Sequence, residues 1–243
     1  MMDAFEPLTG PPTRFRAAWH GLGNQLRHPT GVVGRLLGLV MNRLNALPNQ
    51  AAVEALAPRP GDTVLELGSG PGHGVALAMA AVGPAGIVHG VDQSAVMLRQ
   101  AARLNRQSRH RGQLHLHLGR FDTLPLPAGS VDGILAVNVA YFWHHSVGIL
   151  REARRVLRPG GRLAVYVTDA ATMRRWPFAR TGTHRLFTPT ELTAMLRGGG
   201  FPDESISIRS VSLGHGIRGL IATAENPRPV GLCDEGAAPE ANI

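Results

Sequence analysis

The spacing of hydrophobic positions changes near residue 60. Before that point, apolar residues between Val33 and Leu47 recur at three- and four-residue steps, which predicts helix over about 15–56. Beyond it, short apolar runs alternate with helical patterns. The runs predict strands at 63–67, 87–91, 113–118, 131–137 and 162–168, and the helical patterns fall at 74–82, 94–107, 147–157 and 188–197.

Strands that alternate with helices predict an α/β fold, because parallel strands need crossover connections that cover both faces of the sheet. Two further apolar runs, at 204–210 and 217–224, predict two final strands. We therefore expect a Rossmann-like, doubly wound sheet of seven mostly parallel strands with an N-terminal helical cap. The predicted parts are a flexible arm at 1–14, the cap at 15–58, the main domain at 59–224 and a disordered tail at 225–243.

The composition excludes several kinds of chemistry. The 243 residues include 25 basic and 17 acidic ones, and every basic residue is arginine. Without lysine, no mechanism that needs a lysine amine is available. The single cysteine, Cys233, excludes an internal disulfide framework and a cysteine-rich metal site, and we predict no metal. No apolar run approaches the roughly 20 residues that span a bilayer, and no signal peptide is recognisable, so we expect a cytoplasmic protein without a membrane span.

The segment Val64–Gly74, VLELGSGPGHG, carries most of the chemical information. A strand runs directly into glycines at alternate positions, which allows positive φ and close approach of a ligand to the backbone. The dinucleotide pattern G-x-G-x-x-G is not matched, because His73 stands where its third glycine would be in one register. Glu66 would repel a phosphate but attract a sulfonium or an ammonium group.

Asp92 ends the second predicted strand, about 20 residues beyond the loop. A carboxylate there can accept hydrogen bonds from ribose hydroxyls, which fits NAD and S-adenosylmethionine equally well. Alternatively, it takes part with Ser94 in capping the next helix.

Four segments together resemble a known family. They are VLELGSGPGHG, VDQSAVML, LPLPAGSVDGILAVN and LRPGGRLAV, and in this order they are similar to the signature segments of class I S-adenosylmethionine-dependent methyltransferases. The similarity covers about residues 50–210 and is greatest to the small-molecule branch that includes the ubiquinone and menaquinone C-methyltransferases. It implies S-adenosyl-L-methionine as the cofactor.

The resemblance also implies roles for individual residues. The loop residues would surround the methionine and ribose, Glu66 would lie near the ammonium group, Asp92 would bind the ribose, and the carbonyl of Asn138 would face the ammonium group. The implied cofactor contacts are Glu66, Gly68, Ser69, Gly70, Gly72, Asp92, Gln93, Met97 and Asn138, with Gln93 and Met97 beside the adenine. Arg120 stands where many relatives have an acid that binds the adenine amine. Either Asp122 takes over that role, or Phe121 stacks on the adenine and backbone groups hold it.

The acceptor side is predicted from the end of the fourth strand. Residues 138–145 contain three aromatic side chains and two histidines, which indicates a pocket wall, although the aromatic residues could equally anchor the next helix. His144 is the first candidate for a general base, His145 the second and Tyr141 the third. The alternative is two exposed histidines and catalysis by positioning alone.

Two further segments could close the site. Residues 169–188 are rich in arginine and aromatic side chains and could form a lid over an anionic or aromatic acceptor. In the cap, three asparagines lie in an apolar helical pattern and either point at the ligand or make only local hydrogen bonds. These residues are Met173, Arg174, Arg175, Trp176, Phe178 and Arg180 in the lid, and Asn42, Asn45 and Asn49 in the cap.

Three functions remain open at this point. The first is methyl transfer to oxygen, nitrogen or carbon of a small molecule by in-line displacement. The second is nucleic-acid methylation, with phosphate contacts from Arg99, Arg103 and Arg106, but residues 138–141 lack the two prolines of the motif typical of base amino-methyltransferases. The third is a protein that binds the cofactor without transferring its methyl group. The oligomeric state is open, a homodimer included.

Overall fold

The computed structural model describes residues 41–214 and 216–228, together with the isolated positions 19, 21 and 31. The predicted arm at 1–14, the tail beyond 228 and most of the predicted cap lie outside the described residues. What remains of the cap is helical at 41–44 and continues into α3, Ala46–Leu56.

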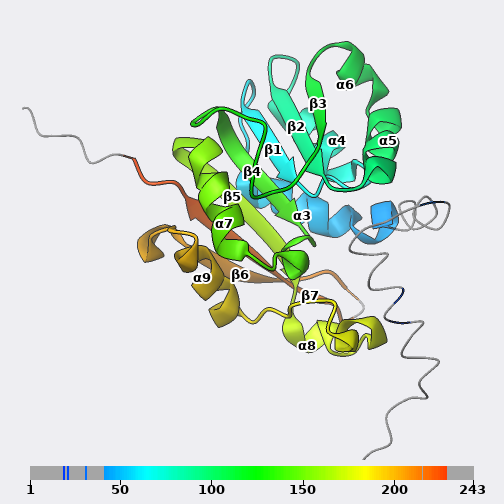
Figure 1. Ribbon diagram of the computed structural model, residues 1–243, viewed down its shortest axis with the longest axis vertical. Helices are drawn as coiled ribbons and strands as arrows, with labels where there is room; N and C mark the ends of the chain where they lie inside the picture. The colour runs from blue at the N-terminus through cyan, green and yellow to red at the C-terminus, as the bar shows by residue number, and fades with distance from the viewer. Residues whose placement is uncertain (1–18, 20, 22–30, 32–40, 215, 229–243) are drawn as a thin grey trace, which may run out of the picture.

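A seven-stranded sheet forms the centre of the molecule (Figure 1). Its order is β3-β2-β1-β4-β5-β7-β6, and β7 runs antiparallel to both of its neighbours. This confirms the predicted Rossmann-like sheet of seven mostly parallel strands. The strands are β1 Thr63–Leu67, β2 Ile87–Asp92, β3 Leu114–Leu118, β4 Val131–Val137, β5 Leu157–Thr168, β6 Ser207–Ser212 and β7 Arg218–Glu225.

Helices cover both faces of this sheet because alternate strand residues point to opposite sides. Apolar side chains of α3 and α4 pack with Val64 and Val88 on one face, whereas those of α7 and α9 pack with Leu65 and Leu163 on the other. The helices after α3 are α4 His73–Val82, α5 Ala95–Leu104, α6 Arg106–His110, α7 Ser146–Val156, α8 Ala170–Met173 and α9 Pro189–Gly198. Short 3-10 turns lie at Ala140–Phe142, Pro177–Thr181 and Asp203–Ser205.

Two boundaries differ from the sequence prediction. The helix expected over 94–107 is divided into α5 and α6, because the buried Asn105 donates its side-chain amide to the carbonyls of Ala101 and Gly72. The strand predicted over 162–168 begins earlier, because β5 already starts at Leu157.

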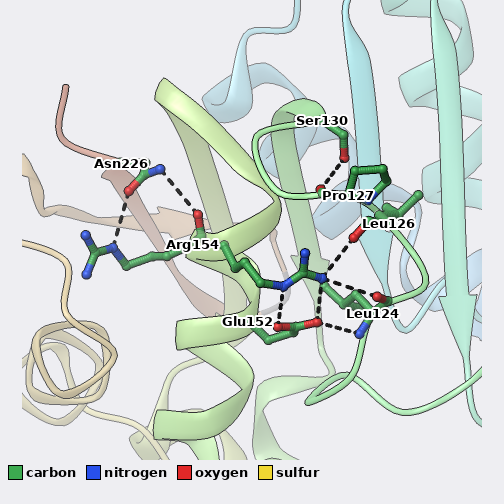
Figure 2. A network of polar contacts seen from close by, with 8 residues as sticks. Leu124, Leu126, Pro127, Ser130, Glu152, Arg154 and Asn226 are labelled. Carbon is green, nitrogen blue, oxygen red and sulfur yellow. Dashed lines mark hydrogen bonds and ion pairs between the residues drawn. The ribbon is translucent and has the colours of Figure 1, made fainter. Parts of the chain in front are cut away.

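A distant residue, Asn226, explains the early start of β5. Its backbone N–H donates to the carbonyl of Gly161, and its carbonyl accepts from Gly160 N–H. Its side-chain Nδ2 donates to the carbonyls of Leu157 at 2.9 Å and Arg154 at 3.3 Å. The segment after α7 is therefore held as strand by partners that follow it by more than sixty residues. Figure 2 shows the contacts between Asn226 and Arg154 near the end of α7.

The connection from β3 to β4 contains no helix and is tied to α7 instead (Figure 2). Leu124 N–H donates to Glu152 Oε1 at 2.8 Å, and Arg155 donates to the carbonyls of Leu124 and Leu126. Arg155 and Glu152 also form an ion pair at 2.7 Å. These contacts fix the connection against the sheet and so determine where residues 120–122 lie.

We expect Asn226→Ala to lower the free energy of unfolding by about 1–3 kcal/mol, because the carbonyls of Arg154, Leu157 and Arg158 would lose a donor. Urea denaturation measures this change. Ser210→Ala, on the exposed side of the edge strand β6, is the control and should change stability by less than about 0.5 kcal/mol. Equal effects of the two substitutions would contradict the role given to Asn226.

Candidate functional site

A cavity of about 450 Å³ lies at the carboxyl ends of β1, β2 and β4. This is the edge at which parallel α/β sheets bind ligands. Its wall is assembled from the helical residues 41–49, the loop after β1, the turn after β2, residues 120–122 and residues 137–145. Most of the residues predicted for the site line it: Glu66, Gly68, Ser69, Gly70, Asp92, Gln93, Met97, Phe121, Asp122, Asn138, His144 and His145.

The glycines of the loop serve two different purposes. Gly68 and Gly70 have φ of +74° and +50° and line the cavity. A Cβ on Gly68 would lie 2.7 Å from Val139 Cγ2, so only glycine lets the ends of β1 and β4 approach this closely. Gly72 is not among the lining residues. It precedes α4 at φ +93°, where a Cβ would collide with Ala101 of α5, so it permits helix packing.

Glu66 is a buried carboxyl group aimed at the start of α4. Its Oε2 atom has no hydrogen-bond partner among the described residues. Burial raises its pKa well above the ordinary value, the charge of Asp92 raises it further, and a backbone hydrogen bond from Val75 opposes both. A buried acceptor without a partner is costly, so the site suits a ligand that brings a donor or a positive charge.

Asp92 caps the turn after β2 and also lines the cavity. Its Oδ2 accepts from Gly70 N–H and its Oδ1 accepts from Ser94 N–H, each at 2.8 Å. The two interpretations of Asp92 are therefore compatible, because a carboxylate can accept several hydrogen bonds at once. Ser94 is the N-cap of α5, as predicted, and accepts from Met97 N–H.

Arg120 and Asp122 pair with each other at the rim. The Arg120 guanidinium binds both carboxylate oxygens of Asp122, and this bond lowers the pKa of Asp122. His145 lies close enough for its charge to lower that pKa further. Between the two charged residues of this segment, Phe121 is buried against the core and lines the cavity.

The wall after β4 contains Phe142, Trp143, His144 and His145, as the aromatic cluster predicted. Trp143 is buried, and its Nε1–H has no partner among the described residues. Tyr141 corrects the prediction, because it does not line the cavity. Its buried hydroxyl accepts from Thr168 N–H and donates to Asn138 Oδ1 at 2.8 Å, and burial raises its pKa. This placement does not suit a general base.

The segment 169–188 supports the wall from behind instead of covering the site. None of its described residues lines the cavity. The buried His184, whose pKa burial lowers to about 4, packs against Phe142 at 4.8 Å and Phe178 at 5.3 Å between ring centroids. Trp176 stacks on Phe178. Nothing in the described structure makes this segment a lid.

Sequence reasoning did not name every lining residue, and His73 and Ile149 are two that it missed. His73 belongs to the quoted loop segment GSGPGHG, so its position at the start of α4 was a usable signal. Ile149 of α7 reaches the cavity only through the tertiary packing of that helix, for which the sequence carries no signal.

The described part of the chain contains no helix long and apolar enough to cross a membrane.

Comparison with known proteins assigns part of the chain to a family. Residues 65–165 match the family model described as "Methyltransferase domain". An uncharacterized 37.1 kDa protein in transposon TN4556 of Streptomyces fradiae is 41% identical over 48% of this chain and 33% of its own length. The ubiquinone/menaquinone biosynthesis C-methyltransferase of Syntrophotalea carbinolica is 36% identical over 55% of this chain and 54% of its own.

A solved structure supports the fold. The S-adenosylmethionine-dependent methyltransferase from Aquifex aeolicus superposes with a TM-score of 0.64 at 19% identity, covering 84% of this chain and 97% of that one. The chain thus carries a class I S-adenosylmethionine-dependent methyltransferase domain, whose cofactor is S-adenosylmethionine. The ubiquinone/menaquinone methyltransferases are among its distant relatives. The chain spans between a third and about half of the length of the two curated relatives named above.

We expect Glu66→Gln to stabilise the protein without ligand, and to do so more at pH 8 than at pH 5. The folded-state pKa of Glu66 lies above its unfolded value, so the wild type loses stability as pH rises from the unfolded toward the folded value. The glutamine amide keeps the shape of the carboxyl group and has no proton to lose, so it stays neutral at both pH values. Urea denaturation at both pH values measures the difference.

Glu54→Gln removes one carboxylate from an exposed position of α3 and serves as the control for the change in net charge. A stability gain from Glu66→Gln that is the same at pH 5 and pH 8 would show that Glu66 does not titrate across this range.

Proposed function

We propose that the protein transfers the methyl group of S-adenosylmethionine to a small-molecule acceptor. The observation that carries the proposal is the combination, in one cavity, of the unpartnered Glu66 Oε2 atom with Asp92 beside the loop of Gly68 and Gly70. A positively charged amino-acid end fits the first group, and ribose hydroxyls fit the second. A pyrophosphate would place negative charge against both carboxylates.

The remaining wall residues fit the rest of the cofactor. Met97 and Phe121 offer apolar surfaces on which the adenine can lie, and Gln93 lies at the turn that carries Asp92. The backbone carbonyl of Asn138 is our candidate for a second contact to the ammonium group. Bound S-adenosylmethionine supplies a methyl group activated by its sulfonium.

The chain contributes mainly by positioning the acceptor. Transfer by in-line displacement needs the acceptor atom held behind the methyl carbon, and positioning can provide much of the rate acceleration. His144 and His145 remain candidates for a base at the mouth of the cavity, where both are exposed. His145 lies near Asp122, which is beside the proposed adenine contact Phe121 and not near the methyl group. His144 is therefore the better candidate for the base.

The position and lining of the site favour a small acceptor over a nucleic acid. The cavity lies between the helical residues 41–49 and the wall after β4, and this arrangement suits a molecule that enters whole. Arg99, Arg103 and Arg106 belong to α5 and the start of α6, and none of them lines this cavity. A protein that binds the cofactor without transferring its methyl group stays a second candidate, because Glu66 and Asp92 account for binding alone.

Cofactor binding can be tested through Asp92. S-adenosylmethionine and S-adenosylhomocysteine should raise the melting temperature of the wild type, and NAD should not. Asp92→Asn should weaken S-adenosylhomocysteine binding by about 1–3 kcal/mol in calorimetry, because one acceptor of the ribose hydroxyls becomes a donor. Asp62→Asn changes a carboxylate that also accepts a backbone N–H in a turn but lies away from the cavity, and it should leave binding unchanged. Stabilisation by NAD alone would refute the proposal.

Catalysis is tested separately from binding. Methyl transfer to a panel of phenols, amines and carboxylates should detect product, and His144→Ala should slow turnover by about 100-fold if His144 is the base. A loss below threefold would assign catalysis to positioning. No product from any of the three classes, despite tight cofactor binding, would favour the second candidate.

A further inference from the structure

Residues 41–49 direct three asparagine side chains toward the cavity and two leucine side chains toward solvent. Asn42, Asn45 and Asn49 follow each other at three- and four-residue steps, so they share one face of the helix, and all three line the cavity. Leu44 and Leu47 are 72% and 53% exposed. A buried polar face is informative, because it costs free energy unless its amides find partners.

A directional chain of hydrogen bonds determines which way two of these amides face. It begins at Thr168, whose backbone N–H can only donate, and its acceptor is the hydroxyl of Tyr141. The Tyr141 hydroxyl therefore gives its one proton to Asn138, at 2.8 Å. The atom of Asn138 that accepts it must be Oδ1.

The second half of this series of hydrogen bonds follows from the first half. With Oδ1 of Asn138 facing Tyr141, its Nδ2 donates to Asn45 at 2.9 Å, so the atom of Asn45 that accepts is Oδ1. The Nδ2 group of Asn45 then faces away from Asn138, and its two N–H groups have no partner among the described residues. Tyr141, buried behind the wall, thus fixes a donor on the opposite side of the site.

The location of this donor indicates what it binds. Asn45 bonds to Asn138, the next residue Val139 lies against Gly68, and Glu66 lies two positions before Gly68. Asn42, one helical turn before Asn45, has a buried Oδ1 without a partner, as does Glu66 at Oε2. Acceptors and a donor at the same end of the cavity match an α-amino acid, in which an ammonium and a carboxylate group share one carbon.

We infer that Asn45 Nδ2 donates to the carboxylate at the amino-acid end of the cofactor, and that Tyr141 is the positioning residue that orients it through Asn138. The unpartnered acceptors Glu66 Oε2 and Asn42 Oδ1 face the ammonium group of the same end. This inference rests on the proposed function, since it takes S-adenosylmethionine to lie with that end beside Gly68.

The test compares two ligands that differ at that end. S-adenosylhomocysteine has the carboxylate, whereas 5′-methylthioadenosine lacks the whole amino-acid end. Asn45→Asp keeps the oxygen that accepts from Asn138 and replaces the donor by a negative oxygen. We expect it to weaken S-adenosylhomocysteine about 10- to 100-fold and 5′-methylthioadenosine less than threefold, both measured by calorimetry.

Stability distinguishes this polarity from the reverse one. With the polarity inferred here, Asn45→Asp preserves the bond to Asn138, so its melting temperature should exceed that of Asn45→Ala. With the reverse polarity, the new carboxylate would face Asn138 Oδ1, and Asn45→Asp would be the less stable of the two. Gln107→Glu, an exposed amide-to-acid change on α6, controls for net charge and should change neither affinity.

Tyr141→Phe tests the positioning role without changing the lining of the cavity. It frees the Asn138 amide to rotate, so the affinity for S-adenosylhomocysteine should fall about 3- to 10-fold while that for 5′-methylthioadenosine stays the same. A purely structural role would lower the two affinities together.

The inference is overturned if Asn45→Asp weakens both ligands equally, weakens neither, or is less stable than Asn45→Ala. If the wild type binds neither ligand, the proposed function itself fails.

Discussion

The parallel pairing of β1 with β2 on one side and β4 on the other is the constraint on which the site depends. It brings three carboxyl ends to one edge of the sheet, so that Glu66, Asp92 and Asn138 meet although 72 positions separate the first from the last. The pairing requires β1 and β4 to end in close contact. Gly68 makes that contact sterically possible, and Gly70 donates its N–H to Asp92, which joins the loop to the end of β2.

The cavity is lined by polar groups that have no hydrogen-bond partner among the described residues. Glu66 Oε2, Asn42 Oδ1, Ser69 Oγ and Trp143 Nε1 are all buried and unpartnered among the described residues, and all four residues line the cavity. Each costs free energy in the ligand-free protein. A bound ligand can supply the missing hydrogen-bond partners, so these groups indicate which polar groups the ligand has. Their mixture of acceptors and donors suits a zwitterionic end better than a phosphate.

The sequence predicted the parts of the fold that follow from local pattern. Strands β1 and β4 begin and end where the apolar runs do. Helix α9 begins with Pro189 behind a capping box of Thr188 and Glu191. It misplaced the start of β5, because the Pro-Gly-Gly sequence is typical of a turn, whereas backbone and side-chain bonds from Asn226 hold it as a strand. The break between α5 and α6 likewise depends on Asn105, which bonds across to Gly72 of the loop. In both cases a distant partner overrode a local preference.

For the site, the sequence by itself determined the chemical types and their approximate place. Glycines at alternate positions after a strand, an acid before them and an acid at the end of the next strand predicted a nucleoside-binding site, and the resemblance of four segments to a known family implied the cofactor. Only the tertiary structure decided the roles of individual side chains. It removed Tyr141 from the candidate bases, paired Arg120 with Asp122, and placed Gly72 in helix packing. The reason is physical: residue type and spacing fix what a side chain can bind, whereas hydrogen-bond direction and burial depend on neighbours that are distant in the chain.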